Sequence, residues 1–265
     1  MDIFQTIVLA LIQGLSEFLP ISSSAHLLLP KELLGWSDQG LAFDVVVHLG
    51  TLFAVVYYYR ANLKTLSGDF YHSLIDKKTI GESKLAWGVL LATIPVGLVG
   101  LFFKDFIETN FRSIEVIAYA TLLFGFLLAV ADWVSKRNPS PRNSINWTDV
   151  LFVGVMQALA LIPGTSRAGI TITAGLLIGL SAQMSTRFAF LLSIPVITLS
   201  AFLMLAELSQ SALEVDWIAL TLAFIVSGVS AYLTVVFFIK LLDKIGLMPF
   251  VVYRFILGVL LLLLI

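Results

Sequence analysis

Long apolar stretches, separated by short polar segments, make up most of the chain. A helix that spans a membrane needs about 20 mostly apolar residues, and six stretches of that length occur. They lie near residues 41–60, 85–104, 114–134, 184–205, 217–239 and 249–265. The pattern predicts an all-α polytopic membrane protein with six transmembrane helices.

Two further apolar regions, 3–34 and 148–182, are interrupted halfway by a polar turn. Residues 19–24 read LPISSS, and residues 162–167 read IPGTSR. Proline ends one helix and serine caps the next, while each half is too short to span a bilayer. We therefore expect two re-entrant helical hairpins, because an irregular turn is tolerated at membrane depth only inside protein or in a wet cavity.

The two interruptions also resemble each other. A constant offset of 143 residues relates three pairs of positions, Pro20 and Pro163, Ser23 and Ser166, and Ala25 and Ala168. Such self-similarity indicates an internal repeat. We predict one membrane domain over 1–265, in which 1–134 and 148–265 are the two halves of an inverted repeat and 135–147 links them.

Lysine and arginine gather on one side of this predicted topology. The loops at 61–84, 135–147 and 240–248 fall on that side and hold most of the basic residues. By the positive-inside rule this side is cytoplasmic, so both termini are expected outside the cytoplasm. The first hairpin then enters from the outside and the second from the cytoplasm, as inverted repeats do when they meet near the midplane.

Composition excludes several classes of function. The chain is 59% hydrophobic and 12% charged, against roughly 45–50% and about 25% in soluble domains, so a soluble enzyme is not expected. A net charge of −1 without a basic block gives no reason to expect a nucleic-acid partner. The absence of cysteine excludes disulfides and thiolate chemistry. The N-terminus lacks the features of a secretory signal, so we expect the whole chain to be the working unit.

Chemically capable side chains gather around the first interruption. Gln13 and Glu17 are four residues apart, so both project from one helix face towards the turn. The serines at 22–24 open the next half-helix, and His26 follows about one turn later. The N-terminus of a helix favours an anion, so the spacing brings hydroxyls, an imidazole and a carboxylate to a potential anion site.

The second interruption supplies a positively charged side chain. Thr165 and Ser166 stand at the start of a half-helix, followed by Arg167 and Thr171. The planar guanidinium can donate two hydrogen bonds to a phosphate at once. If the two turns meet, they combine an arginine clamp, two helix N-termini, a hydroxyl or imidazole nucleophile, and a carboxylate that acts as a base or holds a hard cation.

Structural roles compete with these functional ones. Serine and threonine in membrane helices commonly bond back to a carbonyl, and Glu17 and Arg167 could simply neutralise each other. Asp44 and His48, four residues apart, either line the same cavity or form a structural pair. We expect the remaining intramembrane arginines, Arg187 and Arg254, to snorkel to the interface and leave them out of the site.

Two segments carry a family resemblance. Residues 13–26, QGLSEFLPISSSAH, and residues 163–171, PGTSRAGIT, resemble the undecaprenyl-diphosphate phosphatases of the bacitracin-resistance type. Segments 43–50, 187–195 and 253–255 are similar to the same family, so the resemblance runs along the whole chain.

The resemblance implies a multi-pass enzyme of the bacterial inner membrane. With the charge pattern above, both termini are then expected on the periplasmic side. Such an enzyme hydrolyses undecaprenyl diphosphate to undecaprenyl phosphate and inorganic phosphate, recycles the lipid carrier for peptidoglycan synthesis and confers bacitracin resistance. It also implies dependence on a divalent cation, Mg²⁺ or Ca²⁺. Its partners are the lipid substrate and membrane lipid, and a homodimer is compatible with the sequence.

Carried onto this chain, the family motifs give a candidate site. The implied catalytic residues are Glu17, Ser23, His26 and Arg167, with Glu17 also binding the metal. The implied substrate-binding residues are Gln13, Ser22, Ser166, Arg167 and Thr171. Gln13 stands where the family often has glutamate, which leaves one carboxylate in the motif. Either Ser23 or His26 attacks the terminal phosphorus, and the spacing does not choose between them. A transporter is the rival function, since inverted repeats with broken helices are a common transporter plan.

Overall fold

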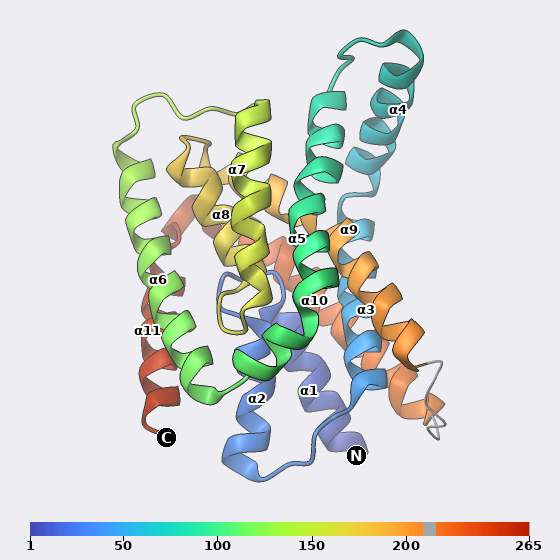
Figure 1. Ribbon diagram of the computed structural model, residues 1–265, viewed down its shortest axis with the longest axis vertical. Helices are drawn as coiled ribbons and strands as arrows, with labels where there is room; N and C mark the ends of the chain where they lie inside the picture. The colour runs from blue at the N-terminus through green and yellow to red at the C-terminus, as the bar shows by residue number, and fades with distance from the viewer. Residues whose placement is uncertain (209–215, 265) are drawn as a thin grey trace.

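The computed structural model describes residues 1–208 and 216–264, leaving aside the side chains of residues 108 and 207, and these residues are almost wholly helical (Figure 1). They form eleven α-helices and one short 3-10 helix, η1. In chain order these are α1 (Ile3–Ser16), α2 (Ser23–Leu34), α3 (Leu41–Tyr58), α4 (Arg60–Asp76), α5 (Ser83–Asn110), α6 (Ile114–Arg137), α7 (Trp147–Ala158), η1 (Leu159–Leu161), α8 (Arg167–Leu177), α9 (Ala182–Leu208), α10 (Trp217–Ile245) and α11 (Met248–Leu262).

Five of the six predicted spans are confirmed as long apolar helices. Helices α3, α5, α6, α9 and α10 are each long and apolar enough to cross a membrane. The sixth predicted span, 249–265, corresponds to α11, which has only 15 residues and is shorter than the roughly 20 residues that a span needs. By length and composition the described part of the chain is a multi-pass membrane protein.

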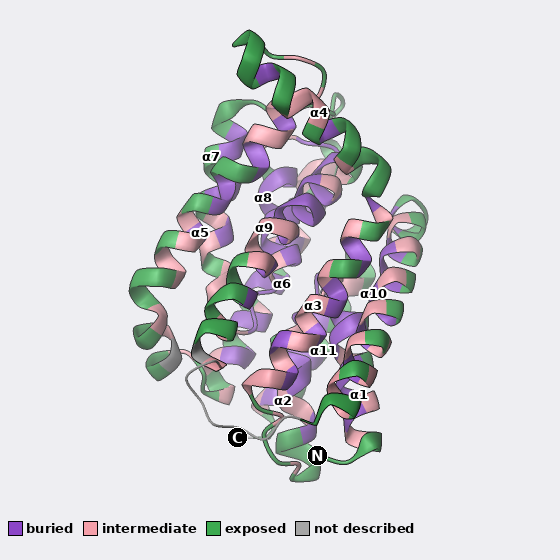
Figure 2. Ribbon diagram, turned by 90° about the vertical axis from the view of Figure 1, so that its right-hand side faces the viewer, coloured by how far each residue is buried: buried purple, intermediate pink, exposed green. Residues whose placement is uncertain are grey.

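The outer surface of the bundle is apolar. Large side chains such as Phe102 and Phe202 are 73% and 68% exposed, and Figure 2 shows exposed residues along the outward faces of the helices with buried residues between the helices. Water would disfavour so much exposed apolar surface, whereas a bilayer favours it. The bundle is therefore built to face lipid.

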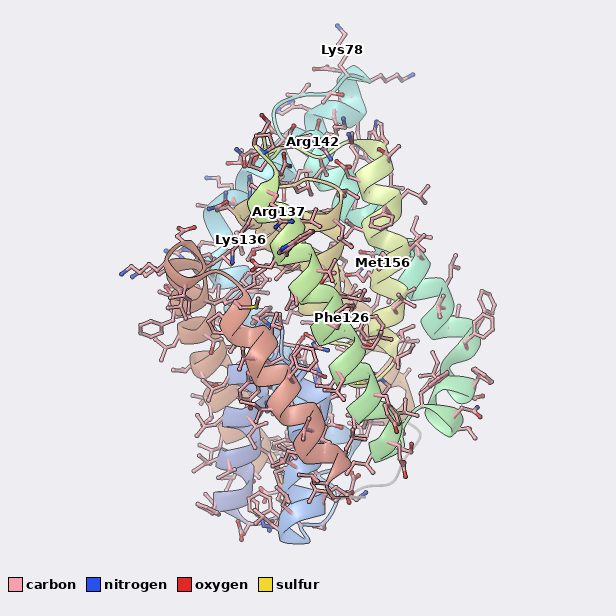
Figure 3. The ribbon with its side chains drawn as sticks, turned by 90° about the vertical axis from the view of Figure 1, so that its left-hand side faces the viewer. Lys78, Phe126, Lys136, Arg137, Arg142 and Met156 are labelled. Carbon is pink, nitrogen blue, oxygen red and sulfur yellow. The ribbon has the colours of Figure 1, made fainter. Side chains whose placement is uncertain are left out.

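Each predicted interruption is a turn between two antiparallel half-helices. The pair α1 and α2 rises from the end of the molecule that carries both termini and returns to it, and the pair α7 and α8 does the same from the opposite end (Figure 1). The two turns meet in the middle of the bundle, where the Ser24 hydroxyl accepts a hydrogen bond from the Gly164 N–H at 3.4 Å. Lys78, Arg137 and Arg142 lie towards the end opposite the termini (Figure 3).

The helix starts of the two hairpins differ by one residue more than the 143 residues that relate the motifs. Asp2 and Asn146 begin α1 and α7 with capping boxes, and Ser22 and Ser166 precede α2 and α8 with φ of 74° and 69°. Both pairs are 144 residues apart, so Ser22 rather than Ser23 corresponds to Ser166. The offset of 143 aligned the prolines, but the helix starts are set by the serines with positive φ.

Small residues let α10 approach α1 and α3 closely. A Cβ added to Gly14 of α1 would lie 2.6 Å from the Ser227 carbonyl oxygen, and one added to Gly50 of α3 would lie 2.6 Å from that of Phe224. Close backbone approach of this kind is how helices associate where no hydrophobic effect drives them together. These contacts hold the first hairpin and α3 on one scaffold helix.

We expect Gly50→Ala to lower the free energy of unfolding by about 1–3 kcal/mol, because the added methyl overpacks the contact between α3 and α10. Gly68→Ala is the matched control, since a Cβ at Gly68 of α4 meets no atom within 4 Å and alanine favours a helix by about 1 kcal/mol over glycine. Thermal unfolding in one detergent measures both. Equal melting temperatures for the two variants would rule out tight packing at Gly50.

Candidate active site

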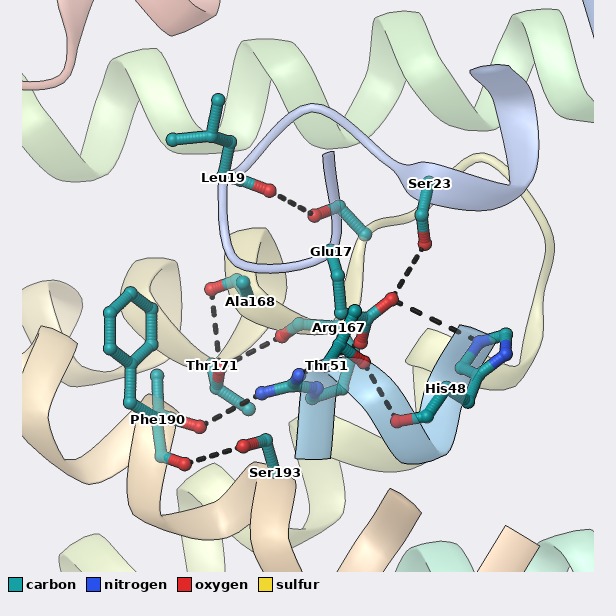
Figure 4. Close-up of polar contacts among 12 residues, drawn as sticks. Glu17, Leu19, Ser23, His48, Thr51, Arg167, Ala168, Thr171, Phe190 and Ser193 are labelled. Carbon is teal, nitrogen blue, oxygen red and sulfur yellow. Dashed lines mark hydrogen bonds and ion pairs between the residues drawn. The ribbon is translucent and has the colours of Figure 1, made fainter. Parts of the chain in front are cut away.

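The Glu17 carboxylate lies at the centre of the meeting point of the two turns (Figure 4). Its Oε1 accepts a hydrogen bond from Arg167 Nη2 at 3.0 Å. Its Oε2 accepts from Ser23 Oγ at 2.9 Å and from Gln13 Nε2 at 3.0 Å. The side chain is 8% exposed, so this carboxylate is stabilised by protein donors more than by solvent. The structure thus brings together four of the predicted site residues.

Ser23 and Arg167 reach Glu17 from matching positions in their half-helices. Each is the first residue of its half-helix and directly follows a serine with positive φ. With the 144-residue offset they occupy equivalent positions. The two half-helix N-termini therefore face one carboxylate, one presenting a hydroxyl and the other a guanidinium.

Arg167 is held on two sides. Besides the ion pair with Glu17, its Nη1 donates to the Ala189 carbonyl oxygen of α9 at 3.0 Å. The side chain is 11% exposed and lines the same cavity as Ser23. A guanidinium fixed in this way, with further N–H groups left to donate, suits the recognition of a phosphate oxygen.

His26 lies outside this cluster. Its Nδ1 is 2.6 Å from the Ser22 carbonyl oxygen, and its Nε2 is 2.6 Å from the Tyr253 hydroxyl of α11, with the two rings stacked. A carbonyl only accepts, so Nδ1 carries the hydrogen and the neutral ring accepts from Tyr253 at Nε2. Both ring nitrogens thus bond partners other than Ser23, although the spacing was expected to bring the imidazole to the same anion site as the serine hydroxyls.

The remaining predicted residues surround the cluster with mostly local bonds. Ser166 Oγ accepts from the Gly169 N–H at 3.1 Å and caps α8. Thr171 donates to the Arg167 carbonyl oxygen at 2.8 Å, which is the back-bonding expected of a membrane threonine. Ser22 shares a hydrogen bond of 3.1 Å with Ser24. Of these residues, Ser22 and Ser166 line the cavity beside Glu17.

His48 joins the site, and the interpretation of Asp44 and His48 as cavity residues is the better of the two. His48 Nε2 is 4.0 Å from Glu17 Oε2, and Nδ1 donates to the backbone oxygen of Asp44 at 2.7 Å rather than to its carboxylate. The Asp44 carboxylate instead accepts from Gln39 at 3.1 Å. The spacing of four residues in α3 was the signal that pointed to this position.

The prediction that Arg254 snorkels is wrong. Arg254 is fully buried in α11, and its guanidinium donates to backbone carbonyl oxygens inside the bundle. Arg187 makes two hydrogen bonds of 2.7 Å to Glu82, so its guanidinium has a protein partner as well as solvent. These bonds hold the pKa of the Glu82 carboxyl below its ordinary value. A charged side chain in an apolar helix needs polar partners, and those of Arg254 lie inside the bundle.

Two cavities meet at the cluster. The inner cavity, of about 280 Å³, combines polar residues with an apolar wall from α5 and α9; its residues include Glu17, Ser23, Arg167, Val96, Val196 and Met204. The vestibule, of about 390 Å³, is more polar, and its residues include Lys31, Asp38, Asp44 and Arg112. Asp38 among them comes from the loop between α2 and α3, which lies at the end of the bundle that carries the termini (Figure 1). Ser23, Ser24 and His48 line both cavities.

The donor set around Glu17 fits a hard cation only in part. No group of three or more histidine, aspartate or glutamate side chains in the described ranges could hold a metal. Gln13 Oε1, however, is buried and has no hydrogen-bond partner among the described residues, while its amide group already bonds Glu17. Mg²⁺ is commonly held by one or two carboxylates with substrate phosphate oxygens, so Glu17 and the Gln13 amide oxygen are the groups here that could contribute ligands.

We expect Glu17→Gln and Arg167→Met each to cost about 3–5 kcal/mol of folding free energy, because each leaves a buried partner uncompensated. The double variant should lose much less than the sum. Removing the exposed pair Lys31 and Asp38, 3.9 Å apart, is the control and should change stability by no more than about 1 kcal/mol. Additive losses at Glu17 and Arg167 in denaturant unfolding would contradict a coupled pair.

Known proteins match this chain along nearly its whole length. A sequence profile described as "Bacitracin resistance protein BacA" matches residues 6–260. "Undecaprenyl-diphosphatase" of Ruthia magnifica subsp. Calyptogena magnifica is 63% identical over 259 residues, covering 98% of this chain and 97% of that protein. "Undecaprenyl-diphosphatase 2" of Stutzerimonas stutzeri (strain A1501) is 55% identical over 266 residues, covering 100% and 98%. The chain therefore belongs to the family of the bacitracin resistance protein BacA.

Proposed function

We propose that this chain is a membrane phosphatase that hydrolyses undecaprenyl diphosphate to undecaprenyl phosphate and inorganic phosphate. Its support is the convergence of a serine hydroxyl, a carboxylate and a guanidinium at two facing helix N-termini, beside a cavity with an apolar wall. The relatives named for this activity match the chain along its whole length. By recycling the lipid carrier the enzyme supports peptidoglycan synthesis and bacitracin resistance.

Ser23 is the nucleophile in this proposal. Its hydroxyl already donates to Glu17 Oε2 at 2.9 Å, so the carboxylate can take the proton as the oxygen attacks the terminal phosphorus. The bond from that phosphorus to the bridging oxygen breaks, and Glu17 returns the proton to the departing lipid phosphate. Water then attacks the phosphoserine, Glu17 takes its proton, and the Ser23 oxygen leaves with that proton as inorganic phosphate forms.

Arg167 and the half-helix N-termini bind the phosphates. Charge builds up on the equatorial oxygens during phosphoryl transfer, and fixed donors stabilise that charge best. Arg167 is fixed by Glu17 and by the Ala189 carbonyl oxygen. His26 supports the first turn rather than reacting, since its ring nitrogens bond Ser22 and Tyr253.

Glu17 and Gln13 would hold the divalent cation, Mg²⁺ or Ca²⁺. The free Oε1 of Gln13 supplies a neutral oxygen beside the carboxylate, and phosphate oxygens of the substrate complete the shell. When bound, the cation supplies positive charge that offsets the charge of the diphosphate.

The membrane arrangement belongs to the same proposal. Six helices, including α11, cross the bacterial inner membrane and the hairpins α1–α2 and α7–α8 are re-entrant inverted repeats, with both termini periplasmic. The diphosphate then enters through the vestibule from the outer side. The prenyl tail of the bound substrate extends along the apolar wall of the inner cavity, which includes Val96, Val196 and Met204. A homodimer stays a prediction that cross-linking in membranes can test.

Phosphate release from undecaprenyl diphosphate by the purified protein tests the function, and chelator should abolish it. Ser23→Ala should lower kcat by at least about 10³-fold, because the nucleophile is lost. His26→Gln should retain more activity than Ser23→Ala and should still form phosphoserine when the reaction is quenched in acid. In wild type, phosphohistidine recovered after an alkaline quench, which preserves the acid-labile bond between phosphorus and nitrogen, would reverse the two assignments. A folded wild type that releases no phosphate would favour the transporter.

Single cysteines test the topology, because the chain has none of its own. Ser37→Cys and Ser140→Cys form a matched pair, because both serines are exposed and the loops that hold them, between α2 and α3 and between α6 and α7, lie at opposite ends of the bundle (Figure 1). An impermeant maleimide added to spheroplasts should label Ser37→Cys at once and Ser140→Cys only after lysis. The reverse order would turn the protein over in the membrane.

A further inference from the structure

Arg254 is a fully buried arginine whose bonding partners are all backbone carbonyls. Nη1 donates to the carbonyl oxygens of Pro20 and Thr165, at 3.3 and 3.0 Å. Nη2 donates to those of Gly164 and Thr121, at 2.9 and 3.1 Å, and Nε donates to Thr121 at 3.2 Å. One side chain thus makes five hydrogen bonds to three separate parts of the fold.

Those parts include both active-site turns. Pro20 is two residues before Ser22 in the first turn, while Gly164 and Thr165 directly precede Ser166 in the second. Ser22 and Ser166 are the positions with positive φ from which the two half-helices start. Thr121, on α6, anchors the guanidinium to the scaffold. Arg254 therefore holds the stretches of backbone that set the directions of α2 and α8.

The surroundings are shaped around the guanidinium. A Cβ at Gly169 of α8 would lie 3.3 Å from Nη1, and one at Gly125 of α6 would lie 3.2 Å from the Arg254 Cβ. The preceding residue, Tyr253, bonds His26, whose ring holds the Ser22 carbonyl oxygen. Two successive residues of α11 thus brace the first turn, and the second of them also braces the other turn.

A charged side chain buried in a membrane protein costs free energy, and such residues usually have a function. Within the part of the chain that the structure describes, no carboxylate bonds Arg254. In contrast, Arg167, Arg142 and Arg187 pair with Glu17, Asp149 and Glu82. Among the described residues, the hydrogen bonds that compensate the charge of Arg254 all go to backbone carbonyl groups. Its positive charge therefore adds to the field of the two helix N-termini that face the diphosphate.

We propose that Arg254 is a positioning residue for phosphate transfer. By bonding the carbonyls of both turns it locks α2 and α8 in the orientation that aligns Ser23 and Arg167 on Glu17, without itself touching the substrate. The inference deepens the proposed function and rests on it for its kinetic consequence, while the locking of the turns stands on the contacts alone.

Kinetics and amide hydrogen exchange of Arg254→Lys test the proposal. Lysine keeps the charge but cannot reach four carbonyls at once. We expect kcat to fall about 10²-fold through misalignment, with KM changed less than about threefold, and exchange to quicken in 17–24 and 162–167 together. A raised KM with unchanged kcat, or faster exchange in only one turn, would overturn it. Arg187→Lys is the matched control and should leave exchange in both turns as in wild type.

Two further measurements keep the test decisive if Arg254→Lys folds poorly. In wild type, both turns should exchange at one common rate, because one guanidinium closes both; two independent rates would contradict the proposal. In Arg254→Ala, millimolar guanidinium should restore kcat at least tenfold, and no rescue in folded protein would count against it. Wild-type phosphate release is measured first, so a failed function is seen separately from a failed lock.

Discussion

Two breaks in the middle of an apolar helix bundle leave backbone groups without a partner in their own helix. The surrounding structure must supply hydrogen-bond partners for them. The free carbonyls of the turns are met by Arg254, whose five hydrogen bonds reach both turns and α6. The first N–H groups of α2 and α8 have no intrahelical partner. Arg254 thus satisfies carbonyls of both turns from within, while Ser166 Oγ caps one N–H group at the start of α8.

The same constraint explains why two similar hairpins make an asymmetric site. Both turns need a residue with positive φ, and serine fills that position in each, at Ser22 and Ser166. The next residue carries the difference, because Ser23 supplies a hydroxyl and Arg167 a guanidinium. Symmetry of the backbone brings equivalent positions together, and divergence of the side chains gives them separate roles.

The central carboxylate connects these roles. Glu17 accepts hydrogen bonds from donors on α1, α2 and α8 at once. Its carboxylate can therefore take this position only when both hairpins are docked against each other. The ion pair with Arg167 compensates two charges that would each be costly alone. The apolar wall of the inner cavity lies beside this polar centre, which is the contrast that a lipid with a charged head requires.

The sequence by itself determined the helical class, five long apolar helices, both interruptions and most residues of the cluster, because hydrophobic length and proline and serine turns act locally. The resemblance added the family. Only the tertiary structure decided the 144-residue register, the short α11, the separation of His26 from Ser23, and the places of His48 and Arg254. The places of His26, His48 and Arg254 depend on contacts between segments far apart in the chain, such as Tyr253 with His26 and Arg254 with Pro20, which no local pattern records.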